Sequence, residues 1–190
     1  MLLLAAAGVS WGADKPPARA TPSAQQPTPA VKETTTMVPL KPGSSAPDFA
    51  LVDQNGKTVR LGDFKGRKLL LYFYPKADTP GCTTQACSVR DSAADLTKAG
   101  VAAVGVSPDP PADQKKFDTK YSLAFPLLSD TDHKVAKAYD VWGEKTLDGK
   151  KVQGIIRSAF LIDERGKILK TFYNVSPADT VPLALAALKK

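Results

Sequence analysis

The chain has 190 residues, of which 43% are hydrophobic and 24% are charged, and its formal net charge is +7. This length and composition predict one packed globular domain with a tail. The basic residues are spread along the chain without a dense run, and few aromatic residues lie near them. We therefore expect no nucleic-acid partner.

The chain opens on an apolar run, with LLLAAA at residues 2–7 and apolar character to about residue 13. The run is shorter than the ~20 residues of a membrane-spanning helix, so we expect no stable membrane insertion. It is typical of the apolar region of a secretory signal, although no Lys or Arg precedes it. We expect residues 1–13 to be the remnant of a signal peptide and the protein to be exported to a bacterial periplasm; without a working signal it is cytoplasmic.

The next segment, residues 14–37, is rich in Pro, Ala and Thr. Such a composition cannot bury enough apolar surface to offset the entropy lost on ordering. We expect a flexible linker here, followed by a folded domain at residues 38–190.

Within this domain the hydrophobic period alternates between that of strands and that of helices. The expected elements are a β-hairpin turning at Asn55-Gly56, a buried strand at 68–74, a helix from after Gly81 to Gly100, a strand at 101–106, a helix at 112–121, a strand at 125–128, a helix at 133–139, strands at 155–162 and 168–173, and a helix at 176–189 that begins with Ser176 as cap and Pro177. This order predicts an α/β thioredoxin-like fold, with a central mixed β-sheet flanked by helices and an N-terminal β-hairpin extension.

Both cysteines lie in one short segment, PKADTPGCTTQAC, at residues 75–87. Cys82 follows the buried strand and lies in the first turn of the expected helix. Unpaired backbone N–H groups and the positive end of the helix dipole favour a thiolate there. Thr79 offers a hydroxyl that can donate to this thiolate or to a bound oxygen. The setting is typical of a reactive thiol; a buried structural cysteine is the alternative.

Cys87 lies five positions after Cys82. In a regular helix such positions have Cα atoms ~8–9 Å apart, whereas a disulfide needs about 4.4–6.8 Å. A permanent disulfide is therefore disfavoured, and the pair can close only if the first helical turns unwind. Two cysteines and the distant His133, expected at the surface of its helix, do not supply the four ligands of a zinc site, so we expect no metal.

The segment YFYPKADTPGCTTQAC resembles the active-site segment of the peroxiredoxins, and more narrowly of the bacterioferritin comigratory protein or peroxiredoxin Q group. Further segments, among them APDFALVDQNGKTVRLGDFKG, KYSLAFPLLSD and GIIRSAFLIDERGKI, follow in family order. The resemblance implies a thiol-dependent peroxidase that reduces hydrogen peroxide and organic hydroperoxides without a cofactor. It also implies a thioredoxin-like dithiol reductant. A monomer is expected, because resolution by Cys87 needs no second subunit.

The resemblance assigns a role to each matching residue. Cys82 corresponds to the peroxidatic cysteine, which becomes a sulfenic acid, and Cys87 to the resolving cysteine, which closes an intramolecular disulfide. Thr79 corresponds to the threonine that hydrogen-bonds peroxide and thiolate, and Pro75 to the proline that shields the pocket from water. Arg157 corresponds to the arginine that stabilises the thiolate; without the resemblance, it is read as an ion-paired structural residue.

One position departs from the group. Gln85 stands where the group usually has Glu, and a neutral amide cannot form an ion pair with Arg157. This leaves the orientation of the arginine open, although not the thiol chemistry.

The alternatives on the same fold need other cysteine spacings. An exported thiol–disulfide oxidoreductase of the thioredoxin kind usually carries Cys-x-x-Cys, and a copper-delivery protein calls for Cys-x-x-x-Cys with a distant histidine. The spacing in this chain is Cys-x4-Cys, which favours the peroxidase.

Overall fold

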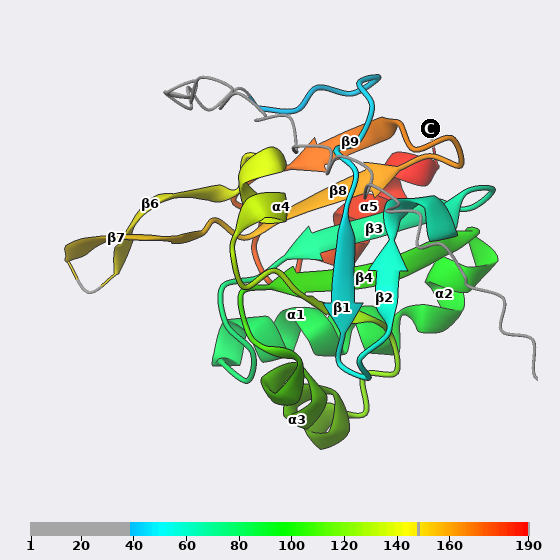
Figure 1. Cartoon of the computed structure of the whole chain (residues 1–190). Coiled ribbons are helices and arrows are strands. Elements are labelled where there is room, and N and C mark those ends of the chain that lie inside the picture. Colours follow the sequence, from blue (N-terminus) through cyan, green and yellow to red (C-terminus); the bar gives the residue numbers. More distant parts are fainter. Residues whose placement is uncertain (1–38, 148, 190) are drawn as a thin grey trace, which may run out of the picture. The chain divides into compact units, whose positions relative to one another are not determined.

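The computed structural model describes residues 39–147 and 149–189 (Figure 1). The predicted signal remnant (1–13) and linker (14–37) lie outside these residues, so both stay predictions. Within the described ranges, no helix combines the length and the apolar character needed to cross a bilayer.

The described residues form nine strands and five α-helices, together with one 3-10 helix, η1. In chain order the elements are β1 (Ala50–Asp53), β2 (Thr58–Arg60), η1 (Leu61–Phe64), β3 (Lys68–Phe73), α1 (Pro80–Asp91), α2 (Ala93–Lys98), β4 (Val101–Ser107), α3 (Pro111–Tyr121), β5 (Leu127–Ser129), α4 (Lys134–Ala138), β6 (Trp142–Leu147), β7 (Lys150–Ile155), β8 (Ser158–Ile162), β9 (Ile168–Phe172) and α5 (Thr180–Leu188). Most lie within a few residues of the elements expected from the sequence.

Seven strands form one mixed sheet in the order β2-β1-β5-β4-β3-β8-β9. β3 is parallel to β4, which is parallel to β5, whereas β8 is antiparallel to β3 and to β9. The predicted thioredoxin-like fold is thereby confirmed, including the N-terminal β1–β2 hairpin. Gly56 lies at φ +79° in that hairpin turn, a conformation that glycine adopts without a steric penalty.

The central strand β3 contributes side chains to two hydrophobic cores, because successive residues of a strand point to opposite faces. Leu69, Leu71 and Phe73 join the core that includes α4. Leu70 and Tyr72 join the core on the other face, which is covered by α1, α2, α3 and α5. The continuous apolar run of β3 therefore fits a strand that is buried on both faces.

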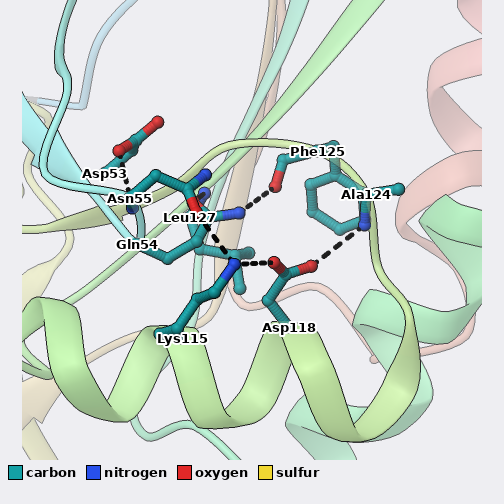
Figure 2. Close-up of polar contacts among 8 residues, drawn as sticks. All are labelled: Asp53, Gln54, Asn55, Lys115, Asp118, Ala124, Phe125 and Leu127. Carbon is teal, nitrogen blue, oxygen red and sulfur yellow. Dashed lines mark hydrogen bonds and ion pairs between the residues drawn. The ribbon is translucent and has the colours of Figure 1, made fainter.

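Gln54 links the N-terminal hairpin to the start of β5 by side-chain hydrogen bonds. Its amide Nε2 donates to the Phe125 carbonyl (2.9 Å), and its Oε1 accepts from the Leu127 N–H (2.8 Å) (Figure 2). Close by, Lys115 of α3 donates to Asn55 Oδ1 (2.8 Å). These contacts pair the polar groups of the hairpin turn within the chain, and they assign this cluster a structural role.

The structure differs from the sequence prediction in one helix, one strand and one hairpin. The helix expected up to Gly100 is interrupted at Ser92, whose φ of −94° and ψ of 8° lie outside the helical region. The strand expected at 155–162 is two strands, because the chain leaves its partner β6 at Ile155 and pairs with β3 and β9 only from Ser158 onward. The hairpin β6–β7, which stands apart from the main sheet in Figure 1, was not predicted.

The C-terminal helix begins later than predicted. Ser176 and Pro177 lie in a turn, in which the Asp179 N–H donates to the Ser176 carbonyl (3.1 Å). Helix α5 begins at Thr180 with Asp179 as its N-cap residue. The prediction that Ser176 caps this helix is therefore wrong. The strand expected at 125–128 is likewise shifted, to Leu127–Ser129.

Gly105 of β4 is required by a side chain of the neighbouring strand. A Cβ at this position would lie 2.8 Å from Cζ and Oη of Tyr72 and 3.1 Å from Cδ2 of Leu127. Tyr72 is fully buried and cannot move aside. The Tyr72 ring therefore lies across β4 at Gly105, the one residue of that strand without a side chain.

We predict that Gly105→Ala lowers the free energy of unfolding by about 1–3 kcal/mol, because the new methyl group overpacks this contact. Chemical denaturation measures the change. Gly62→Ala is the matched control, since no heavy atom lies within 4 Å of a Cβ there, and it should leave stability within about 0.5 kcal/mol. Equal stabilities of the two variants would contradict the packing assigned to Gly105.

Candidate active site

The pairing of β3 with β8 brings Cys82 and Arg157 to the same end of these two strands. Phe73, the last residue of β3, pairs with Ser158, the first residue of β8. The segment that follows β3 and the residue that precedes β8 consequently leave the sheet side by side. Cys82 lies on the first of these segments and Arg157 on the second, so that two residues distant in sequence meet at the N-terminus of α1.

Helix α1 begins directly before Cys82. Thr79 is its N-cap residue, with an extended backbone, and the Thr79 carbonyl accepts the first helical bond from the Thr83 N–H (2.8 Å). Pro80 is the first helical residue, where a missing N–H costs nothing. Cys82 is the third and is only 1% exposed. Its thiol is therefore in the first turn, as predicted, where the helix dipole favours negative charge.

The loop between β3 and α1 is held on two sides. The Ala77 N–H donates to Oδ2 of Asp109, at 2.7 Å. Asp78 adopts a φ of +57° and accepts from Lys120 Nζ (2.8 Å) and from the Tyr121 hydroxyl (2.7 Å) of α3. The hydrogen bond from Lys120 lowers the pKa of Asp78 below its usual value. The bridge therefore stays ionised at neutral pH and stabilises this uncommon backbone conformation.

Arg157 places a cation against the sulfur. Its Nη2 donates to Sγ of Cys82 at 3.3 Å. The Arg157 backbone is itself anchored, because its carbonyl accepts from the Val175 N–H at 2.9 Å. A charge-assisted hydrogen bond of this kind stabilises the thiolate form of a cysteine.

The second nitrogen of the guanidinium contacts Gln85. Arg157 Nη1 donates to Oε1 of Gln85 at 2.5 Å, and Nε2 of Gln85 donates to Oγ1 of Thr180 at 2.8 Å. Gln85 and Thr180 are both fully buried. The departure from the usual Glu thus leaves the arginine oriented, by a chain of neutral hydrogen bonds that ends on α5.

The guanidinium lies over Gly81, where a side chain would obstruct it. A Cβ at Gly81 would lie 3.3 Å from Nη2 of Arg157 and 3.4 Å from Cγ of Pro177. The Arg157 guanidinium and Pro177, in the turn before α5, therefore both lie against the first turn of α1.

Two tyrosines of the β3 segment lie near the thiol. Burial raises the pKa of Tyr72 and of Tyr74 far above the usual value for tyrosine. Both phenols are therefore neutral at any physiological pH. They add bulk and low polarity beside Cys82 and no charge.

The remaining predicted site residues are Cys87, Thr79 and Pro75. Cys87 is a free, half-buried thiol on the same intact helix as Cys82. In the described residues, the Thr79 hydroxyl donates to the Lys76 carbonyl (2.9 Å) rather than to the thiol. Pro75 is half-buried and directly follows the β3 segment. The sequence reasoning missed Thr180, which no motif marks.

Comparison with known proteins places this site in a family. The family model described as "AhpC/TSA family" matches residues 42–171. The chain belongs to the AhpC/TSA family of peroxiredoxins, in the bacterioferritin comigratory protein (peroxiredoxin Q) group. The resemblance seen in the cysteine segment is thereby confirmed, and thiol peroxidase chemistry is the activity of this family.

Relatives of this peroxiredoxin cover most of the folded domain. It is 49% identical over 154 residues to peroxiredoxin Bcp of Escherichia coli, which covers 81% of this chain and 99% of that protein. It is 47% identical over 147 residues to peroxiredoxin Bcp of Bacillus subtilis, which covers 77% of this chain and 94% of that protein. Among solved structures, peroxiredoxin Q of Xanthomonas campestris matches with a TM-score of 0.72 at 37% identity, covering 79% of this chain and 95% of that chain.

We predict that Arg157→Met lowers the rate constant for reaction with peroxide by about 10²–10³, the usual effect of removing one donor that stabilises developing charge. Stopped-flow measurement of peroxide consumption gives this constant. Arg165→Met is the matched control, because the Arg165 side chain is 81% exposed in the β8–β9 turn, and it should react like the unchanged protein. A full rate in Arg157→Met would contradict the role given to the contact with Cys82.

Proposed function

We propose that this peroxiredoxin reduces hydrogen peroxide and organic hydroperoxides through Cys82, with Cys87 as the resolving cysteine. The observation that carries the proposal is the 3.3 Å hydrogen bond from Arg157 to the sulfur of Cys82 in the first turn of α1. It supplies what a peroxidatic thiol requires: a stabilised thiolate and a cation beside the reacting atoms.

In the first step the Cys82 thiolate attacks the terminal oxygen of the hydroperoxide. A sulfur–oxygen bond forms, the O–O bond breaks, and the other oxygen leaves as an alkoxide or hydroxide that takes up a proton from water. Cys82 becomes a sulfenic acid. Arg157 stabilises the negative charge that develops on the leaving oxygen. Thr79, at the start of the same helix, supplies a hydroxyl that can turn from the Lys76 carbonyl to the bound peroxide, and Pro75 limits access of water.

In the second step the Cys87 sulfur attacks the sulfenic sulfur, water leaves, and a disulfide forms. The two cysteines lie on one helix, with Cα atoms ~8–9 Å apart by helix geometry, and a disulfide needs about 4.4–6.8 Å. The first turns of α1 must therefore unwind before the sulfurs can bond. Because both cysteines belong to one chain, this step requires no second subunit, which supports a monomer.

A dithiol protein of the thioredoxin kind then reduces the disulfide by exchange and becomes oxidised itself. If the protein is exported, as its apolar first residues predict, this donor is a periplasmic dithiol protein. The substrate range is supported by the bacterioferritin comigratory protein of Xanthomonas campestris, 37% identical with a TM-score of 0.72, which has alkyl peroxide reduction activity. The alternative is a thiol–disulfide oxidoreductase of the thioredoxin kind. It is disfavoured because that class usually carries Cys-x-x-Cys, whose sulfurs bond without unwinding a helix, whereas this chain has Cys-x4-Cys.

We predict that Cys82→Ser abolishes peroxide consumption, because no other residue replaces the attacking thiolate. Cys87→Ser should consume one equivalent of peroxide and stop at a sulfenic acid, which mass spectrometry detects directly or as an adduct with a trapping reagent. A coupled assay with thioredoxin-like donors tests recycling of the unchanged protein. Full turnover in Cys82→Ser would refute the assignment, and multiple turnovers in Cys87→Ser would refute its resolving role.

A further inference from the structure

The Gln85 amide has one orientation that satisfies both of its ends. A guanidinium carries only donors, so Arg157 can bond only to the amide oxygen, as it does at 2.5 Å. The amide nitrogen must then find an acceptor inside the protein, because Gln85 is fully buried. The Thr180 hydroxyl is that acceptor, at 2.8 Å. Gln85 and Thr180 together therefore fix the position of the guanidinium.

This arrangement does not neutralise the arginine. Within the described part of the chain, no carboxylate forms an ion pair with Arg157. Of the titratable groups packed near the thiol, Tyr72 and Tyr74 of the β3 segment are neutral because burial raises the pKa of each. Asp179, the acidic residue at the start of α5, is exposed. Cys87, farther along α1, is half-buried.

We propose that Gln85 and Thr180 form a neutral clamp, which holds the Arg157 guanidinium against Cys82 without cancelling its positive charge. The clamp leaves the whole charge available to the thiolate and to the leaving oxygen of the peroxide. The inference rests on the proposed function, since it concerns how the arginine is held at the proposed peroxidatic thiol. Gln85 and Thr180 act through Arg157 and are positioning residues.

Replacing the Gln85 amide by a carboxylate tests the effect of an added charge separately from the position of the Arg157 guanidinium. Glu has the shape of Gln, can accept from Arg157 in the same way, and can accept from the Thr180 hydroxyl in place of donating to it. We therefore expect the fold and the position of the arginine to be preserved, with only a negative charge added. A like charge near a titrating group disfavours its ionised form.

The decisive experiment follows thiolate absorbance at 240 nm against pH in the Cys87→Ser chain, where Cys82 is the remaining cysteine. We expect Gln85→Glu to raise the midpoint by about one pH unit or more, which is a tenfold or greater loss of thiolate below the midpoint. The measurement uses no peroxide. Absence of peroxidase activity would therefore refute the proposed function and leave this result standing.

Gln153→Glu is the matched control for net charge. Gln153 is exposed on β7 and precedes Arg157 by four residues, or ~13 Å of extended chain. Because water and salt screen such a charge, the midpoint should stay where it is in the parent chain. An unchanged or lowered midpoint in folded Gln85→Glu would overturn the neutral clamp, and so would an equal shift in Gln153→Glu.

Substitutions of Thr180 keep the proposal testable if Gln85→Glu gives no cooperative thermal transition. Thr180→Asp places the carboxylate one hydrogen bond farther from the arginine than Gln85→Glu does. It should therefore raise the midpoint of thiolate formation too, but by less than Gln85→Glu. Thr180→Val removes the acceptor and should slow the peroxide reaction about tenfold or more, by displacing the arginine, whereas Thr180→Ser should restore the rate. A normal midpoint in Thr180→Asp, or a normal rate in Thr180→Val, would overturn the clamp.

Discussion

The contact between the Arg157 guanidinium and the Cys82 sulfur is the interaction on which the active site depends. It joins residues 75 positions apart in the sequence, so the sheet must bring them together before any chemistry is possible. The antiparallel register of β3 and β8 does this by pairing Phe73 with Ser158. The local helix dipole and the arginine then act on the same atom, and each favours the thiolate.

The same helix that holds the proposed peroxidatic thiol also keeps the proposed resolving thiol away from it. While α1 is intact, Cys82 and Cys87 are too far apart to bond. The loop before α1 is nevertheless held firmly, by Asp109 at Ala77 and by α3 at Asp78. This division predicts that catalysis alternates between a folded helix that attacks peroxide and a locally unwound helix that closes the disulfide, while the sheet beneath stays unchanged.

Sequence patterns were sufficient where a property is local. The apolar run at β3, the turn at Gly56 and the position of Cys82 after a strand follow from period and residue type alone. The break between β7 and β8 was missed, because apolar residues on both sides of Arg157 and Ser158 do not record that the chain changes its pairing partner there. Thr180 was missed for a related reason: it lies 95 residues from Gln85, and a threonine at a helix start has no pattern that indicates a buried partner.

Amide hydrogen exchange of the reduced protein and of the protein oxidised by one equivalent of peroxide tests the account most directly. We predict that amides in the first turns of α1, around residues 82–88, lose protection on oxidation, whereas the β3 strand keeps it. Mass spectrometry of the same sample should identify the Cys82–Cys87 disulfide. A disulfide between these two residues with the protection of α1 unchanged would contradict the account.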